Sequence, residues 1–429
     1  MTTPQTLRDL SCADDYDPNS MPVERAREYI GSFLTPVTAT ERVHVRAALG
    51  RVLADDIVSP IAVPAHDNSA MDGYAVRFDD LRTDTEVALR VTDATAFAGK
   101  PVADALAAGA AVRIMTGGVL PSGADTVVMQ EMVTRTGATV TIPPLAAAKI
   151  RARGTNTRKA GEDLKAGSIA LQRGWRVSPA ELGLIAALGI SEVTVYRKLR
   201  VAFFSTGDEL RAIGQTLGPG EIYDSNRYTL YGMLTRVGCD IVDMGVVIDD
   251  AEAVERAFKT AAEIADVVIT SGGVSVGEAD YIKPVLEKLG EVLFWKIAMK
   301  PGRPLAYGRL GRALFFGLPG NPVSVMATFY QFVREPLMRL AGQTRLPPLP
   351  TFKVALETPV KKAAGRTEFQ RGIYRHHPDG SSGVTITGDQ GSGILSSMTQ
   401  ANCFVILGPE IGNVAAGELV DVQMFEGMI

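Results

Sequence analysis

The pattern of apolar and polar positions changes twice in the first half of the chain. Residues 22–53 follow helical spacing, with apolar side chains on one face at Val23, Ala26, Tyr29, Ile30 and Phe33. Residues 60–160 instead hold short β-branched runs separated by glycine and proline, which predicts a β-rich module. Helical spacing returns at residues 179–188, where Ser178 is a suitable N-cap and Pro179 a suitable first residue. The pattern therefore predicts a β-rich module inserted between two helical pieces that pack together.

In the β-rich module the sequence predicts strands at residues 87–91, 111–115, 126–130 and 139–142. From residue 198 to 340 strands and helices alternate. Strands are predicted at 201–205, 241–246, 267–270, 292–297 and 313–316, and helices at 228–237, 251–264, 280–289 and 322–340. This alternation is typical of a mostly parallel sheet covered on both faces, in which ligands bind beyond the carboxyl ends of the strands.

A proline-rich break at residues 346–350 separates this region from short strands and turns that predict a small β-barrel or sandwich. We therefore expect four domains. They are a discontinuous helical linking domain (20–59 with 160–197), an inserted β-rich domain (60–159), an α/β domain (198–345) and a C-terminal β-domain (346–429). The predicted fold class is an α/β multidomain protein.

Charge and cysteine content narrow the possible functions. The net charge of −4 over 429 residues gives no reason to expect nucleic acid or an anionic membrane as partner. Cys12, Cys239 and Cys403 lie far apart and form no CxxC pair, which argues against a disulfide framework and against zinc. The four histidines form no HExxH motif. Any metal is therefore expected to be a hard cation held by oxygen ligands, which points to Mg²⁺.

The first residues show no basic segment followed by an apolar one, as a signal peptide would. No apolar run approaches the ~18 residues that a membrane-spanning helix needs. We therefore expect a soluble, cytoplasmic protein.

The loop that follows the predicted strand 267–270 has the chemistry of an anion site. Ser271, Gly272, Gly273 and Ser275 lie between this strand and the next predicted helix. Glycines there would allow backbone N–H groups and a helix N-terminus to approach an anion closely. The loop is not a Walker motif, because no Lys-Ser/Thr pair follows the glycines. By itself it is equally consistent with an ordinary tight turn.

Other strand ends of the α/β region carry charged or capping residues. Acidic residues stand at 208–209 and 249–250, and Asn321-Pro322 begins a helix after the last strand. The loop 296–304 brings three cations, at Lys296, Lys300 and Arg303. Each feature alone could be a helix cap or a solvated loop. Together they favour a site for Mg²⁺ and a phosphate or another oxyanion.

These motifs, with others in the β-rich module, resemble one family closely, the molybdopterin molybdenumtransferases, which include the E domain of gephyrin. The matching motifs follow the family's order and span about residues 20–425. They lie at residues 67–77, 114–117, 161–163, 205–210, 222–226, 271–280, 300–304, 318–324 and 369–372. The resemblance implies an α/β domain of the molybdopterin-binding type, a C-terminal β-barrel and an elongated homodimer of four-domain chains.

The resemblance also implies a reaction, the last step of molybdenum cofactor synthesis. Molybdate is inserted into adenylylated molybdopterin with Mg²⁺ present, and AMP is released. Transient contact with the adenylyltransferase that supplies the substrate and with molybdoenzymes that accept the product is also implied. Tungstate has the same shape and charge as molybdate, so it is an equally suitable oxyanion.

By motif match, the catalytic group consists of Asp72, Thr116, Asp163, Glu209, Asp249 and Asp280. Of these, Glu209, Asp249 and Asp280 would hold the metal. The substrate-binding group consists of Ser271, Gly272, Gly273, Ser275, Lys296, Lys300, Arg303, Pro319, Pro322, Ser324, Arg371 and Ser392. Because the family site lies at a dimer interface, Asp72, Thr116 and Asp163 would act on the partner's α/β domain.

The chain departs from the family at two places. Arg303 stands where many relatives have lysine, which keeps the charge and allows bidentate binding of an oxyanion. Residues 388–393, around Ser392, match only loosely. Two rival functions stay open. An adenylyltransferase has a similar α/β domain but usually no further domains, and a non-catalytic scaffold would need a peptide groove that nothing in the sequence identifies.

Overall fold

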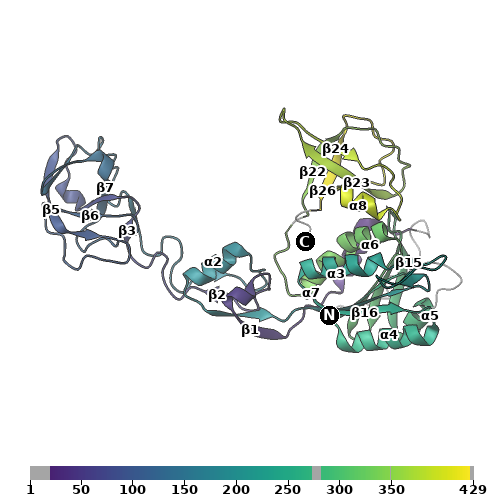
Figure 1. The fold of residues 1–429 in the computed structure, drawn as a ribbon. Coiled ribbons are helices and arrows are strands. Elements are labelled where there is room, and N and C mark those ends of the chain that lie inside the picture. Colours follow the sequence, from purple (N-terminus) through teal and green to yellow (C-terminus); the bar gives the residue numbers. More distant parts are fainter. Residues whose placement is uncertain (1–19, 273–281, 348, 426–429) are drawn as a thin grey trace, which may run out of the picture.

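The computed structural model describes residues 20–272, 282–347 and 349–425. The chain is elongated, with a β-rich part at one end, a small linking part in the middle, and the α/β part beside a C-terminal barrel at the other end (Figure 1). Within these residues no helix is both long and apolar enough to cross a membrane.

The α/β part is built on a six-stranded sheet in the order β16-β13-β17-β21-β20-β18. The first four strands in this order run parallel, and β20 is antiparallel to both of its neighbours. The bounds are β13 Arg200–Thr206, β16 Asp240–Val247, β17 Val267–Ser271, β18 Gly290–Lys296, β20 Pro304–Leu310 and β21 Ala313–Leu318. The predicted mostly parallel sheet is thus confirmed. Strand β20 was not predicted, because proline and glycine are poor strand formers and both occur within it.

Helices cover both faces of this sheet, as the strand pattern predicts. Phe203 and Phe316 face the layer that contains α3, α6 and α7, whereas their neighbours Phe204 and Phe315 face α4 and α5. The helix bounds are α3 Ser225–Val237, α4 Ala251–Ile264, α5 Ile282–Leu289, α6 Pro322–Thr328 and α7 Arg334–Leu340. A π-helical turn, Phe329–Val333, joins α6 to α7. Alternate side chains of a strand point to opposite faces, so one apolar run supplies two cores.

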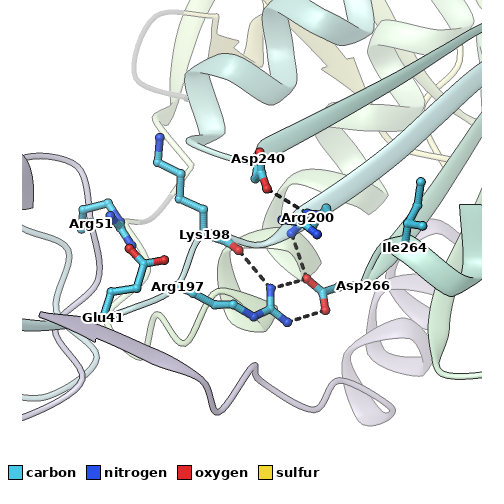
Figure 2. Close-up of a pocket in the computed structure, with 8 residues that line it drawn as sticks. All are labelled: Glu41, Arg51, Arg197, Lys198, Arg200, Asp240, Ile264 and Asp266. Carbon is cyan, nitrogen blue, oxygen red and sulfur yellow. Dashed lines mark hydrogen bonds and ion pairs between the residues drawn. The ribbon is translucent and has the colours of Figure 1, made fainter.

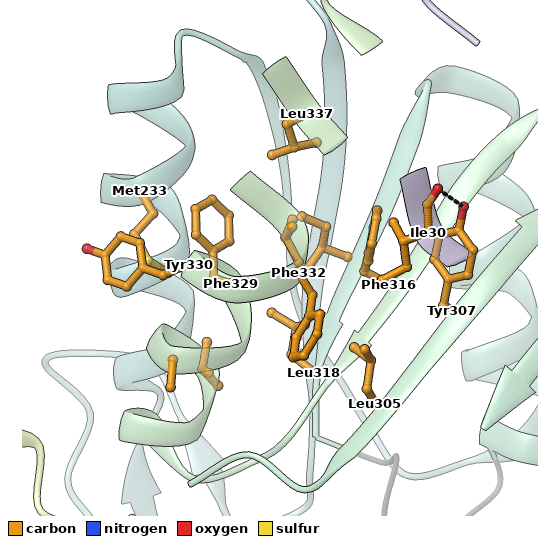
Figure 3. Close-up of a cluster of buried hydrophobic side chains, with 14 of the residues drawn as sticks. Ile30, Met233, Leu305, Tyr307, Phe316, Leu318, Phe329, Tyr330, Phe332 and Leu337 are labelled. Carbon is orange, nitrogen blue, oxygen red and sulfur yellow. Dashed lines mark hydrogen bonds between the residues drawn. The ribbon is translucent and has the colours of Figure 1, made fainter. Parts of the chain in front are cut away.

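The N-terminal helix is shorter than its pattern predicts. Helix α1 spans Val23–Ser32 and is followed by β1 (Thr40–His44) and a 3₁₀ turn (Val45–Ala48), so the prediction of helical structure through residue 53 is wrong. Pro36 explains the early end, because a proline disfavours helical backbone at the residue before it. Helix α1 packs on the α/β core, where the Tyr307 hydroxyl donates to the Ile30 carbonyl at 3.4 Å (Figure 3).

The linking part is held by an antiparallel pair, β1 with β12 (Glu192–Tyr196). Helix α2 spans Pro179–Ala187, and Ser178 forms a capping box with Glu181, which confirms the predicted N-cap. At the junction with the α/β part, the Arg197 guanidinium binds both Asp266 oxygens at 2.7 Å (Figure 2). One further short antiparallel pair, β2 (Ile57–Val58) with β11 (Ile169–Leu171), belongs to the linking part.

The β-rich part contains a six-stranded sheet in the order β7-β4-β6-β5-β9-β8. The bounds are β4 Gly73–Val76, β5 Val87–Ala96, β6 Ala110–Ile114, β7 Thr126–Met129, β8 Thr134–Thr136 and β9 Thr139–Ile142. The four strands predicted here are confirmed. The chain enters and leaves through one antiparallel pair, β3 (Asn68–Ser69) with β10 (Thr157–Arg158), which we call the neck.

The C-terminal part is a closed five-stranded barrel, which confirms the barrel expectation. Its strands follow the order β23-β24-β22-β26-β25, and pairing of β23 with β25 closes the ring. The bounds are β22 Thr351–Leu356, β23 Thr367–His376, β24 Ser382–Ile386, β25 Cys403–Leu407 and β26 Leu419–Met424, with α8 at Leu395–Gln400. The start of β23 also pairs with β19 (Met299–Lys300), which ties the barrel to the α/β part.

Candidate functional site

A cavity of about 890 Å³ lies at the carboxyl ends of the four parallel strands and opens against the barrel. Its position agrees with the general rule that ligands bind beyond the carboxyl ends of strands in α/β sheets. The volume is within the range of small-molecule sites. Acidic residues line one wall and cations the other, and the two walls are described in turn.

The acidic wall comes from the ends of β13 and β16. Glu209 lines the cavity and folds back over Gly207, where an added Cβ would lie 2.5 Å from a Glu209 carboxylate oxygen. Asp249 lines the cavity beside it, and its backbone N–H donates to the Asp208 carboxylate at 3.2 Å. Burial, followed by the negative charges of Asp208 and Glu209, raises the pKa of the Asp249 carboxyl. This wall therefore holds negative charge that is not neutralised by a cation within it.

We expect Asp249→Asn to raise the melting temperature of the metal-free protein at pH 7. The folded-state pKa of Asp249 is raised above its ordinary value of 3.8, so ionisation of this carboxyl opposes folding. This destabilisation is present at pH values above the raised pKa and disappears as the pH falls towards 3.8. Thermal unfolding in EDTA from pH 7 to pH 4 should therefore show a difference that shrinks with falling pH.

Asp250→Ala is the matched control for this experiment. The neighbouring Asp250 side chain caps α4 and accepts a hydrogen bond from Ala253 N–H at 2.9 Å. Its removal should lower stability by about 1 kcal/mol at pH 7. An Asp249→Asn protein that melts at or below the wild-type temperature at pH 7 would contradict the charge repulsion argued for this wall.

The floor of the cavity is formed at the end of β17. Gly272 has φ of +92°, and a Cβ there would lie 2.7 Å from the Thr206 carbonyl oxygen, so only glycine fits. Its N–H donates to the Leu318 carbonyl at 3.1 Å, which joins the ends of β17 and β21. The buried Thr206 hydroxyl has no hydrogen-bond partner within the described parts of the chain, although Thr206 lines the cavity. Its oxygen is buried beneath the cavity surface, next to the Gly272 backbone.

The cationic wall is the loop between β19 and β20. Lys300 and Arg303 both line the cavity from it. Gly302 lies between them with φ of +94°, and a Cβ there would lie 2.6 Å from the Thr328 hydroxyl of α6. The loop is therefore packed tightly against α6, which fixes the position of both cations.

The start of α6 and a barrel loop complete the lining. Pro319, Pro322 and the buried Ser324 line the cavity, and Pro322 is the first residue of α6 as predicted. Ser392 lines it from the barrel, where its hydroxyl accepts a hydrogen bond from the Asn321 side-chain amide at 3.0 Å. Two parts of the chain that lie far apart in sequence thus meet at this wall.

Three predicted site residues of the described chain lie near the cavity but do not line it. Lys296 is exposed at the end of β18. The Ser271 hydroxyl is buried 3.0 Å from that of Ser205. Arg371 is 1% exposed inside the barrel, where it donates to Ser397 and to the Gly391 carbonyl. Burial lowers the pKa of the Arg371 guanidinium, which the charge of Asp389 partly opposes. Arg371 therefore supports the barrel loop that carries Ser392.

Three further predicted residues, Gly273, Ser275 and Asp280, lie outside the described residues. Over the residues that are described, no group of three or more His, Cys, Asp or Glu side chains is arranged to hold a metal ion. The predicted magnesium ligands among them are the neighbouring carboxylates Glu209 and Asp249.

The β-rich part, which carries the predicted residues Asp72 and Thr116, lies at the opposite end of the chain from the α/β part (Figure 1). The Asp72 carboxylate accepts hydrogen bonds from the Thr116 N–H at 2.7 Å and from its hydroxyl at 2.8 Å. These two hydrogen bonds lower the pKa of Asp72. Asp163 is exposed close to the neck, with its N–H bonded to the Val63 carbonyl at 3.0 Å. The structure therefore gathers Asp72 with Thr116 but leaves them apart from the α/β cavity.

Four lining residues were not among the predicted site residues. Asn321 was predicted only to begin a helix, and Asp389 and Gln390 lie in the loosely matching stretch 388–393, whereas Arg366 was not predicted at all. Arg366 is exposed and has no hydrogen bond or ion pair within the described chain. Its signal in the sequence was only a charged residue shortly before the motif at 369–372, which does not reveal that the start of β23 lies against the α/β part.

Chemically, the cavity offers carboxylates for a hard cation on one side and cations for an oxyanion on the other. A ligand that carries phosphate, with a divalent cation beside it, would satisfy both walls. The narrow glycine floor lets backbone groups approach such a ligand.

Comparisons with known proteins match most of the chain to one family. Residues 21–189 match a family model described as the MoeA N-terminal region (domain I and II), and residues 202–339 match a probable molybdopterin binding domain. Residues 353–425 match the MoeA C-terminal region (domain IV).

Among solved structures, the molybdopterin biosynthesis MoeA protein of Pyrococcus horikoshii OT3 is similar, with a TM-score of 0.81 and 29% identity. The match covers 95% of this chain and 100% of that one. It supports the α/β multidomain fold with a C-terminal barrel.

Among curated proteins, the chain is 37% identical over 389 residues to a molybdopterin molybdenumtransferase of Nostoc sp. strain PCC 7120, covering 86% of this chain and 85% of that protein. It is 45% identical over 408 residues to the molybdopterin molybdenumtransferase of Haemophilus influenzae, covering 95% and 99% of the two chains. The chain therefore belongs to the molybdopterin molybdenumtransferase family.

Proposed function

We propose that this protein inserts molybdenum from molybdate into adenylylated molybdopterin and releases AMP, which is the last step of molybdenum cofactor biosynthesis. The observation that carries the proposal is the cavity in which Glu209 and Asp249 lie on one wall and Lys300 and Arg303 on the other. In this reaction a substrate phosphate, a divalent cation and an oxyanion must lie close together. Such a site needs an acidic wall for the cation and a cationic wall for the oxyanion. Full-length similarity to molybdenumtransferases supports the same reaction.

Mg²⁺ fits the acidic wall as a cofactor. Burial, followed by the charges of Asp208 and Glu209, raises the pKa of Asp249, so a cation held at this wall would offset the repulsion between these carboxylates. Carboxylate oxygens and substrate phosphates are the ligands that Mg²⁺ prefers. Glu209 and Asp249 would hold the ion, with Asp280 as the third candidate from the sequence. The bound ion would neutralise the phosphate charge as AMP leaves.

Molybdate suits the opposite wall. It is a tetrahedral dianion, and Lys300 and Arg303 supply positive charge while Ser324 and Ser392 supply hydroxyl groups at the same cavity. The phosphate of the substrate would lie over Gly272 and Thr206 at the floor of the cavity. The buried Arg371 would act by holding the loop that carries Ser392. Lys296 and Ser271 do not line the cavity, so their proposed role is to position the neighbouring strands.

We also propose a cytoplasmic homodimer in which Asp72, Thr116 and Asp163 of one chain complete the cavity of its partner. Their separation from the cavity within one chain supports this arrangement (Figure 1). Transient contacts with an adenylyltransferase that supplies the substrate, and with molybdoenzymes that accept the product, would follow from the reaction.

The proposal is tested by measuring AMP release from adenylylated molybdopterin with Mg²⁺, with and without micromolar molybdate. We expect AMP release to depend on molybdate. We also expect the product to restore activity to a molybdenum-free acceptor enzyme. A second reaction with ATP and free molybdopterin tests the rival adenylyltransferase function. Consumption of ATP there, with no molybdate-dependent release of AMP, would overturn the proposed function.

A further inference from the structure

A second cavity, of about 810 Å³, lies beside the candidate site. Arg303 and Arg366 line both cavities and therefore stand at the boundary between them. Apart from Arg303, the residues that line this second space belong neither to the family motifs nor to the proposed roles. Two adjoining cavities with cations at their boundary are suited to an elongated ligand that has an anionic or electron-rich group near its middle.

The lining of the second cavity differs from that of the first. Apolar surface comes from Pro22 and Val23 at the start of α1, from Ala298 before β19, and from Ile406 and Pro409 of the barrel. Cavities that bind planar rings combine such apolar walls with a few polar groups that fix the orientation. Arginine side chains also stack on aromatic faces. The space is thus suited to a planar heterocycle.

Glu24 is the acidic residue on this lining and lies at its solvent-facing rim, where its side chain is 74% exposed. Arg27 donates to one Glu24 carboxylate oxygen at 2.6 Å, and the guanidinium of Arg27 is itself anchored on the Gln331 carbonyl at 3.2 Å. The second carboxylate oxygen takes part in no hydrogen bond within the described chain. An oriented carboxylate of this kind can accept from two adjacent N–H donors on the edge of a heterocycle.

The rim of the cavity is held firmly. Thr367 N–H donates to the Ala298 carbonyl at 2.9 Å, and Gly365 N–H donates to the Pro409 carbonyl at 2.6 Å. These bonds fix the backbone on both sides of Arg366. A side chain presented from such a backbone loses little freedom when a ligand binds.

We propose that the second cavity binds the pterin ring of the substrate. The aminopyrimidinone edge of a pterin carries adjacent N–H donors that match the Glu24 carboxylate, and its flat face suits the apolar walls. Adenylylated molybdopterin has the order pterin, dithiolene, phosphates, adenosine. With the pterin here and the phosphates at the acidic wall, the dithiolene lies at Arg303 and Lys300, where molybdate is held. This inference rests on the proposed function, because that function supplies the substrate.

The test uses the full-length protein with two variants and one control. Ala364→Trp places an indole in the second cavity, which Ala364 lines, and Glu24→Gln removes the charge proposed to face the ring edge. Ala363→Trp places the same bulk one residue away, at an exposed position that does not line the cavity. Two quantities are measured: the KM for adenylylated molybdopterin in AMP release, and the Kd for neopterin, a fluorescent free pterin, by anisotropy. Calorimetry with AMP reports on the first cavity.

We expect Ala364→Trp and Glu24→Gln each to raise the KM and the neopterin Kd about tenfold. The first variant takes the space of the ring, and the second removes one charged hydrogen-bond acceptor. AMP affinity should stay unchanged in both, and Ala363→Trp should behave as wild type. A KM and a neopterin Kd that Glu24→Gln leaves unchanged would overturn the inference, even if Ala364→Trp misfolds. If the wild type releases no AMP, the proposed function fails, and the neopterin Kd of the variants still decides whether this cavity binds a pterin.

Discussion

Replacing Glu209 by glutamine is expected to lower the kcat for molybdate-dependent AMP release by about 100-fold or more. The Glu209 carboxylate lines the acidic wall beside Asp249, and its size and position are unchanged by the substitution. Only the charge that would hold Mg²⁺ is lost. The same variant should need a higher Mg²⁺ concentration for half-maximal activity, which a magnesium titration of AMP release measures.

Glu252→Gln is the control for this prediction. Glu252 is 87% exposed in the first turn of α4, so its carboxylate faces solvent close to the same end of the domain. It should keep wild-type kcat and magnesium dependence. If Glu209→Gln retained kcat within twofold while its melting temperature matched the wild type, the acidic wall would not be the metal site.

A mixture of two inactive variants is expected to regain activity. Asp72→Asn and Glu209→Gln should each be inactive as homodimers, because each removes one half of every composite site. After subunit exchange about half of the dimers are mixed, and each mixed dimer holds one intact site. The mixture should therefore recover about a quarter of wild-type activity, which AMP release from the purified, exchanged sample measures.

The prediction depends on residues of one chain acting in the cavity of the other. Asp72 is bound to Thr116, which directly follows β6 and Met115 in the β-rich part, whereas Glu209 follows β13 in the α/β part. These two parts lie at opposite ends of the chain, so a site within one chain cannot contain both residues (Figure 1). Mixing Asp249→Asn with Glu209→Gln is the control, because both residues line the same cavity and no exchange restores it. Equal activity in the two mixtures would contradict a shared site.

Much of the site could be predicted from the sequence because local signals placed it. Alternating β-branched runs located the parallel strands, and the residues directly after β13, β16 and β21 had to lie at one edge of the sheet. The family motifs then selected Glu209, Asp249 and Ser324 among the residues at these strand ends, and the structure brings them to one cavity. Glycine at 272 was predicted for the same reason, since its positive φ excludes a side chain.

What the sequence could not supply are contacts between distant segments. Arg366 and Glu24 line cavities because the start of β23 and the start of α1 both pack beside β19, and no local pattern encodes that meeting. Arg371 carries the residue type of an oxyanion ligand, yet its place on a barrel strand turns it inward to Gly391. Helical spacing up to residue 53 was misleading, because Pro36 and the strand β1 override it.

The neck has a consequence for how such a chain can be altered. Ser69 and Thr157 face each other across β3 and β10, and Ala70 N–H donates to the Asn156 carbonyl at 2.9 Å. The two cut points of the β-rich part are thus adjacent, so a short turn could replace residues 70–156 without stretching what is left. In genetic terms, recombination at these two adjacent points could exchange or lengthen the β-rich part, while the flanking coding sequence would still specify the linking, α/β and barrel parts.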